Sequence, residues 1–326
     1  MLSRVADSIY WMSRYIERAE NSARFIDVNL NLSMDLREET NTQWEPLVMT
    51  TGDDALFKTQ YGNPTKENVI RFLTFDTKNP NSILSCVLKA RENARTVREM
   101  IPTEAWEQIN HFFLMVRDAV DSGRAAKDPH GFFTSVKMAS HLFTGITDAT
   151  MSHGEGWHFI RVGRFLERAD KTSRILDVKY FILLPSPGDV GTNLDHIQWA
   201  ALLKSASALQ MYRKQFGPIS PFHVVEFLIL DRLFPRAVHY CLIRVEHSLN
   251  AISGSAEGTF QNPAEKRVGQ LRSLLDYTDI EDIISKGLHE FLDNLQSRLN
   301  GVGAAVSEMY FSPRAAPEMD RKSEGQ

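Results

Sequence analysis

The chain has 326 residues, of which 43% are hydrophobic and 24% are charged, and its formal net charge is −4. These proportions are ordinary for a globular protein with a sizeable core, and a slightly acidic chain has no general attraction for nucleic acid or anionic membranes. The most apolar run, Phe222–Leu230, contains Glu226 and is far too short to span a bilayer. We therefore expect a cytoplasmic protein that binds neither nucleic acid nor a membrane. Its two cysteines, Cys86 and Cys241, should be buried thiols and not a disulfide.

Apolar residues recur at helical spacing along nearly the whole chain. In the first helix they stand three or four residues apart from Val5 to Leu30 and form one apolar face. Because no run alternates with period two between turn signals, we expect an all-α protein almost without sheet. The predicted helices cover residues 3–36, 66–76, 82–100, 104–121, 132–152, 155–184, 193–216, 221–231, 235–253, 263–277 and 280–309. Prolines at or near the first helical position support four of these starts: Pro102, Pro221, Pro235 and Pro263.

One charged segment occurs twice, 150 residues apart. Residues 14–28, RYIERAENSARFIDV, reappear as residues 164–178, RFLERADKTSRILDV, with seven of the fifteen positions identical. Weaker matches continue at an offset of 155, and they end with Cys86 and Cys241. A repeat this long indicates a duplicated half-domain, since the units of solenoids recur every ~20–50 residues.

The duplication predicts the organisation of the whole chain. We expect one compact helical bundle built from two tandem repeats, residues 1–150 and 151–311, related by a pseudo-two-fold axis. The change of offset from 150 to 155 predicts a five-residue insertion, for which residues 185–191 supply loop-forming proline and glycine. The polar, proline-containing tail at 312–326 is predicted to be disordered.

The repeated segment gathers charge on the helix face opposite the apolar one. In the first copy, five residues fall within about 120° of one another on a helix: Arg14, Glu17, Arg18, Asn21 and Arg24. Arg14 and Arg18 are like charges four residues apart, which disfavours a helix by about 0.2–0.5 kcal/mol, and Arg164 and Arg168 repeat the arrangement. An unfavourable pair that is present in both copies suggests a partner elsewhere, either a carboxylate of the other repeat or a bound anion.

We therefore predict reciprocal contacts between the repeats, Glu17 with Arg164 or Arg168 and Glu167 with Arg14 or Arg18. Two interpretations stay open. In the first, the charged faces have a structural role only, as a solvated surface or as a salt-bridge network that locks the repeats together. In the second, they form a polar basin in which the arginine guanidinium groups bind a carboxylate or phosphate. A second basic stripe, Arg91, Arg95 and Arg98, is placed to line the same basin. The candidate residues are Arg14, Glu17, Arg18, Arg24, Arg164, Glu167, Arg168, Arg174, Arg91 and Arg95.

The sequence predicts no metal or cofactor site and no catalytic residue. Glu155-Gly-Trp157-His158 has the Glu-x-x-His spacing of di-iron bundles, but such a site needs a second copy, and the first repeat has Ser8 at the position equivalent to His158. The sequence also lacks the phosphate-binding loop, the dinucleotide-binding fingerprint and the nucleophile elbow.

Several stretches resemble the bacterial Alpha-E family, which is named for its helices and its Glu-Arg motif and has no assigned activity. The resemblance covers nearly all of residues 1–310. It is carried by residues 1–21, Ala90–Arg95, Gly156–Asp170 and Phe234-Pro-Arg236. The pair Arg236-Ala237 departs from the Arg-Ser pair that the resemblance leads us to expect, which weakens any role for a hydroxyl there.

The resemblance implies a function class, because genes of this family typically lie beside circularly permuted ATP-grasp proteins and transglutaminase-like peptidases. It implies a non-catalytic helical partner, or a substrate-presenting subunit, of a system in which an ATP-grasp ligase forms peptide or amide bonds. The alternative is an enzyme that uses paired Glu and Arg residues between the repeats in amide or peptide chemistry. Because neighbouring arginines tend to keep a glutamate ionised, the residues themselves favour the binding role.

Overall fold

The computed structural model describes residues 1–35, 44–182 and 193–312 of the chain. Within these ranges the elements are helices joined by turns, with no strand, which confirms the all-α prediction. The predicted loop at 185–191 and all but the first residue of the predicted tail lie outside the described residues. Within the described ranges no helix is long and apolar enough to cross a membrane.

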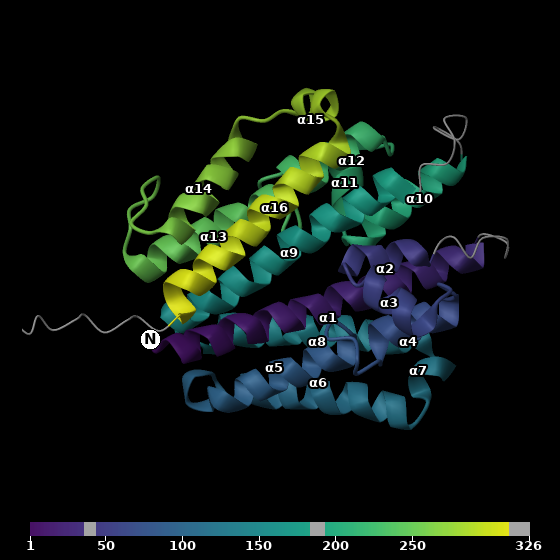
Figure 1. Ribbon diagram of the computed structural model, residues 1–326, viewed down its shortest axis with the longest axis horizontal. Coiled ribbons are helices and arrows are strands. Elements are labelled where there is room, and N and C mark those ends of the chain that lie inside the picture. Colours follow the sequence, from purple (N-terminus) through teal and green to yellow (C-terminus); the bar gives the residue numbers. More distant parts are fainter. Residues whose placement is uncertain (36–43, 183–192, 313–326) are drawn as a thin grey trace, which may run out of the picture.

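The first half of the chain forms one layer of helices, drawn in purple to blue in Figure 1, with the long helix α1 along its inner edge. The elements of this half are α1 (Ser3–Asp35), α2 (Glu45–Thr51), α3 (Asp54–Tyr61), α4 (Lys66–Thr74), α5 (Ile83–Thr96), a 3₁₀ turn (Arg98–Met100), α6 (Thr103–Asp121), α7 (Arg124–Lys127) and α8 (Pro129–Thr150). Side-chain caps set several starts, because Thr65, Ser82 and Asp128 each accept a hydrogen bond from the backbone three residues on.

The second half, teal to yellow, lies against the first through α9, which runs beside α1 (Figure 1). Its elements are α9 (Glu155–Ile182), α10 (Asn193–Ser205), α11 (Leu209–Phe216), α12 (Pro221–Leu230), α13 (Val238–Ser253), α14 (Pro263–Asp276), α15 (Ile280–Lys286), α16 (Leu288–Val306) and a π-helical turn (Ser307–Phe311). Helices α13 and α16 pack on α9, so the two long helices that carry the repeated segment occupy the middle of the molecule.

Two of the predicted helices are interrupted by left-handed residues. The predicted helix at 193–216 is split into α10 and α11 at Ser207, whose φ is +52°. The predicted helix at 280–309 is split into α15 and α16 at Gly287, whose φ is +90°. Apolar periodicity continues across both breaks, and therefore it could not reveal them.

The proline signals are only partly right. Pro221 and Pro263 are the first residues of their helices, as predicted, and Pro102 directly precedes its helix. Pro235 is wrong as a start signal, because α13 begins three residues later, at Val238. The chain before it is held by the side chain of Asp231, which accepts hydrogen bonds from two backbone N–H groups in the turn.

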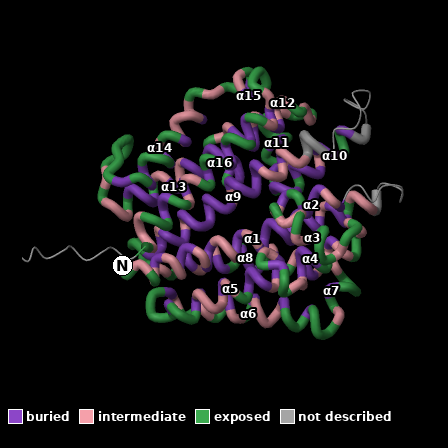
Figure 2. Tube along the Cα trace, in the orientation of Figure 1, coloured by how far each residue is buried: buried purple, intermediate pink, exposed green. Residues whose placement is uncertain are grey.

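The apolar core is divided into two clusters that exchange residues across the middle of the molecule. Tyr10 of α1 belongs to the cluster of the second half, whereas Phe159 and Ile160 of α9 belong to the cluster of the first half. Figure 2 shows buried segments running along both central helices. Helix α1 is therefore buried on its charged side as well as its apolar side, and the two halves share their core.

The two cysteines provide a direct test of this core. Cys86 and Cys241 are free and fully buried, and burial raises the pKa of both thiols to about 12. Because the thiolate is the reactive form, we expect a chromogenic disulfide reagent to label neither thiol in the native protein and both in urea. Rapid labelling of the native protein would contradict this burial.

Candidate functional site

The repeated segments face each other where α1 packs against α9. Gly163 permits the close approach, since a Cβ atom there would lie 2.5 Å from the carbonyl oxygen of Tyr10. At the corresponding position of α1, the hydroxyl of Ser13 donates a hydrogen bond to the carbonyl oxygen of Ile160 at 2.8 Å. The charged side chains on either side of this contact are therefore brought within reach of one another.

Glu167 is the shared acceptor for two arginines of the opposite helix. Its side chain is completely buried. Arg14 Nε donates to Oε2 at 2.8 Å, and Arg18 donates to both oxygens at 2.7 and 3.0 Å. Arg18 also donates to Asn81. The predicted contact between Glu167 and these arginines is confirmed, and one carboxylate compensates the like-charged pair of α1.

Glu17 makes the reciprocal contact. It is 2% exposed and receives a two-pronged hydrogen bond from Arg168, both N–O distances being 2.8 Å. The predicted pairing of Glu17 with Arg168 is thus confirmed. Arg164, the other predicted partner, does not bind Glu17. Its Nε and Nη1 atoms are buried and meet no acceptor among the described residues. The solvated-face interpretation is wrong for this part of α1, because the neighbouring helices cover it.

Arg236 is a member of the network that sequence reasoning did not count as a site residue. It precedes α13, is 7% exposed, and donates to Glu17 at 3.1 Å, to Asn21 at 2.9 Å and also to Glu20. The available signals were its place in the Phe-Pro-Arg stretch of the family resemblance and the polar Asn81 at the equivalent position of the first half. Neither indicates a partner more than two hundred residues away in the sequence.

A second layer of ion pairs lies one turn further along each helix. Arg24 pairs with Glu20, and Arg174 pairs with Asp170 at 2.9 Å, as their four-residue spacing predicts. Glu20 is 1% exposed and also accepts from the hydroxyl of Ser140 at 2.7 Å. The favourable pairs within each helix thus extend the cross-helix network and join it to α8.

The network holds its carboxylates in the ionised form. Burial alone would raise the pKa of Glu167, but the guanidinium groups of Arg18 and Arg14 outweigh it and hold that pKa well below its usual range. The same balance, with Arg168 as the main cation, lowers the pKa of Glu17. Depressed carboxylate pKa values stabilise the folded protein above an unfolded-state pKa of about 4.3, and this stabilisation is lost as the pH falls below it.

The second basic stripe is not joined to this network. Arg91 donates to Asn110 of α6 at 2.8 Å, and its guanidinium carbon lies 5.1 Å from the ring centre of Phe113. The Arg95 side chain is 64% exposed and pairs with Glu92 on its own helix. Both arginines therefore make their contacts on the outer side of α5, away from the network.

One cavity of about 240 Å³ opens beside the network. Arg14, whose side chain is 15% exposed, is the guanidinium that reaches it, and its Nη1 donates to the hydroxyl of Tyr10 at 3.0 Å. The lining residues come from α1, α9, α16 and the π-helical turn: Tyr10, Trp11, Arg14, Leu166, Asp170, Leu299, Asn300, Gly303, Ala304 and Ser307. This mixture of cation, carboxylate and aromatic groups suits a small polar ligand.

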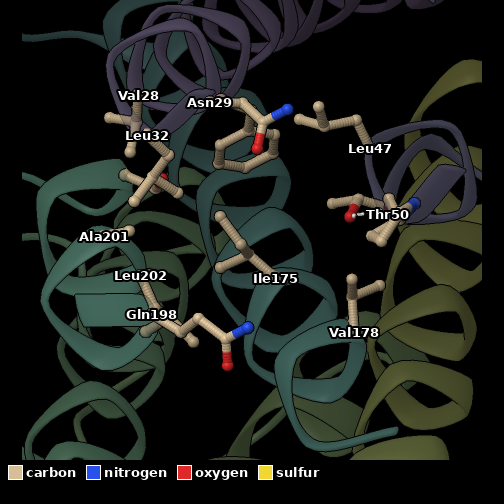
Figure 3. Close-up of a pocket in the computed structure, with 13 residues that line it drawn as sticks. Val28, Asn29, Leu32, Leu47, Thr50, Ile175, Val178, Gln198, Ala201 and Leu202 are labelled. Carbon is tan, nitrogen blue, oxygen red and sulfur yellow. Dashed lines mark hydrogen bonds between the residues drawn. The ribbon is translucent and has the colours of Figure 1, made fainter. Parts of the chain in front are cut away.

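A smaller, apolar cavity of about 70 Å³ lies between α1, α2, α9 and α10. Figure 3 shows Val28 and Leu32 of α1 and Val178 of α9 around it, with Leu47 and Leu202 on the flanking helices. Its walls offer few polar groups. It is therefore a packing space in the centre of the molecule, without the chemistry of a catalytic site. Among the described residues, no three or more His, Cys, Asp or Glu side chains are grouped so that they could hold a metal ion.

The fold and the site together define an all-helical protein in which two copies of a Glu-Arg pair brace two central helices. The chain belongs to the Alpha-E family, whose model, described as a predicted alpha-helical domain with a conserved ER motif, matches residues 1–311. The motif pairs of this chain are Glu17-Arg18 and Glu167-Arg168, and all four side chains take part in the cross-helix network.

The relatives are longer proteins of mycobacteria. A protein of Mycobacterium bovis and one of Mycobacterium tuberculosis are each 23% identical to 94% of this chain, and both are named as uncharacterised proteins. The matched region makes up only 36% of each relative, so this chain spans about a third of their length. No solved structure matches the chain.

Proposed function

We propose that this protein is a non-catalytic helical partner, or a substrate-presenting subunit, of a system in which an ATP-grasp ligase forms a peptide or amide bond. The observation that supports the non-catalytic role is that both motif glutamates are buried and fully engaged in ion pairs. Each is at most 2% exposed and bound by two arginines. A general acid or base needs a pKa near the working pH and access to the substrate, and these carboxylates have neither.

The family resemblance and the relatives' architecture support a partner. The resemblance connects this family with ATP-grasp proteins and transglutaminase-like peptidases. In the mycobacterial relatives the matched region is joined to further sequence that makes up the larger part of the chain. A helical unit that occurs within longer chains fits a role beside another domain.

We further propose that the two halves are duplicated repeats related by a pseudo-two-fold axis. Equivalent residues line the apolar cavity in pairs, among them Val28 with Val178 and Leu47 with Leu202. In Figure 3 the members of each pair lie on opposite sides of the cavity, as expected if an axis passes through it. The reciprocal bonds of the two motif glutamates support the same relation.

Reconstitution with the ATP-grasp partner tests the proposed function. This protein alone should not hydrolyse ATP, whereas adding it to the ligase should increase ADP release that depends on an amino donor. Ala304→Phe, which puts a ring into the cavity beside Arg14, should lower that increase without changing the melting temperature. Ala251→Phe, at an exposed position of α13, is the matched control. ATP-dependent amide formation by this protein alone would overturn the proposal in favour of the enzyme alternative.

A further inference from the structure

Arg164 is a buried cation whose guanidinium lacks a hydrogen-bond acceptor among the described residues. It is 8% exposed, and its Nε and Nη1 atoms, fully shielded from solvent, donate to nothing in the described part of the chain. Arg14, at the equivalent position of α1, has the carboxylate of Glu167 as its acceptor. A buried guanidinium that lacks such a partner is strongly disfavoured, which indicates that an acceptor is supplied from outside the chain.

Three further arginines gather around the same aromatic contact between α9 and α13, and one of them, Arg168, is already paired with Glu17. The ring of Phe165 packs edge-on against Tyr240, with ring centres 5.8 Å apart. Guanidinium carbons lie close to these rings: Arg164 is 4.8 Å and Arg161 is 5.6 Å from the centre of Phe165, and Arg244 is 4.8 Å from that of Tyr240. The two rings thus contact four guanidinium groups, and three of these make no ion pair with any described residue.

Arg161, Arg164 and Arg244 contact aromatic rings but form no ion pair with a carboxylate of the described residues. In the described ranges, Arg161 and Arg244 make no hydrogen bond or ion pair, and Arg244 Nε is buried. Two carboxylates act on Arg164 from nearby. That of Asp148 is exposed and accepts from the indole N–H of Trp157 at 3.2 Å, and that of Glu17 is already paired with Arg168 and Arg236. The site thus holds at least two positive charges more than negative ones.

The electrostatics are consistent with this excess. Burial, and then the charge of Arg168, lowers the pKa of Arg164 to about 10. Burial and the charge of Arg244 lower the pKa of Arg161. His158, at the edge of the cluster, has a pKa of about 4 because of burial and the charge of Arg161, so it is neutral at physiological pH and adds no charge.

We propose that Arg161, Arg164 and Arg244 form a binding site for a phosphate group at the junction of α9 and α13. Guanidinium forks match phosphate oxygens in pairs of hydrogen bonds, and a dianion balances the unpaired cations. Stacking on rings fixes the arginines beforehand, which reduces the entropy lost on binding. The first half has no such site, because Trp11 stands at the position of Arg161 and Glu167 neutralises Arg14.

Thermal melts in inorganic phosphate and in sodium chloride of equal ionic strength test the site. For the wild type, phosphate at tenfold its Kd should raise the Tm by about 2–4 °C over chloride. Arg164→Met should abolish this rise. Its Tm in chloride should equal or exceed that of the wild type, since the variant removes an uncompensated buried charge. A rise of equal size in Arg164→Met, or none in the wild type, would overturn the proposal.

Further variants keep the test decisive. Arg161→Met and Arg244→Met, at partly buried positions, should each weaken phosphate binding about tenfold in calorimetry. Arg213→Met removes an exposed arginine of α11 and should leave binding unchanged; equal weakening by this control would count against a defined site. If ATP raises the Tm of the wild type more than inorganic phosphate does, and Arg164→Met loses this effect, the bound phosphate group belongs to a nucleotide. If ATP and inorganic phosphate raise the Tm equally, the ligand is the free anion. This site is independent of the proposed ligase partner, which is measured by turnover.

Discussion

The Glu167→Gln variant should lose about 3–5 kcal/mol of unfolding free energy, because it leaves two largely buried arginines without their carboxylate. Arg14 and Arg18 converge on Glu167, which is fully buried. Glu17→Gln should cost less, because Arg236 keeps its bonds to Glu20 and Asn21. Urea unfolding followed by circular dichroism measures both changes.

An exposed ion pair supplies the control for this prediction. Glu92 pairs with Arg95 on the surface of α5, where both side chains are more than 40% exposed. Glu92→Gln should therefore change the unfolding free energy by only about 0–1 kcal/mol. Similar small losses in Glu92→Gln and Glu167→Gln would mean that the central network does not brace the halves. If Glu167→Gln melts like the wild type but no longer stimulates the ligase, the Glu167 carboxylate has a functional role and not a structural one.

Gly163→Ala should lower the unfolding free energy by about 1–3 kcal/mol, the usual cost of overpacking a tight contact. The new Cβ atom would lie 2.5 Å from the carbonyl oxygen of Tyr10 and 3.3 Å from Cγ of Arg14. Since the first of these atoms belongs to the backbone, α1 and α9 must move apart, which also disturbs the bond between Arg14 and Glu167. Urea titration of the purified variant gives the change.

Gly145→Ala is the matched control for the helix contact. Gly145 lies within α8, and a Cβ atom there would have no neighbour within 4 Å. Alanine in an exposed helix is favoured over glycine by up to about 1 kcal/mol, so this variant should be as stable as the wild type or slightly more stable. If Gly163→Ala is equally well tolerated, the close approach of α1 and α9 is not required for stability.

The local sequence was enough to predict the long helices and the central contact. Apolar spacing predicted the long helices, since a helix that buries one side must repeat its apolar residues every three or four positions. The like-charged pair Arg14 and Arg18 predicted an external partner, either a carboxylate of the other repeat or a bound anion, and the structure shows that the partner is Glu167. Breaks such as Ser207 escaped this reasoning, because they depend on a single backbone angle that leaves the apolar pattern intact.

Only the tertiary structure decided which charges are buried and how each is compensated. In sequence, Arg14 and Arg164 are equivalent members of the same motif. In the fold, Arg14 meets a carboxylate, whereas Arg236, brought in by the turn before α13, contacts Glu17 where Arg164 was predicted to bind. The sequence by itself determined that two charged helices would meet, because like charges repeated on one face need a partner. Which arginine pairs and which remains free depended on the three-dimensional path of the chain, since contacts between distant residues leave no local pattern.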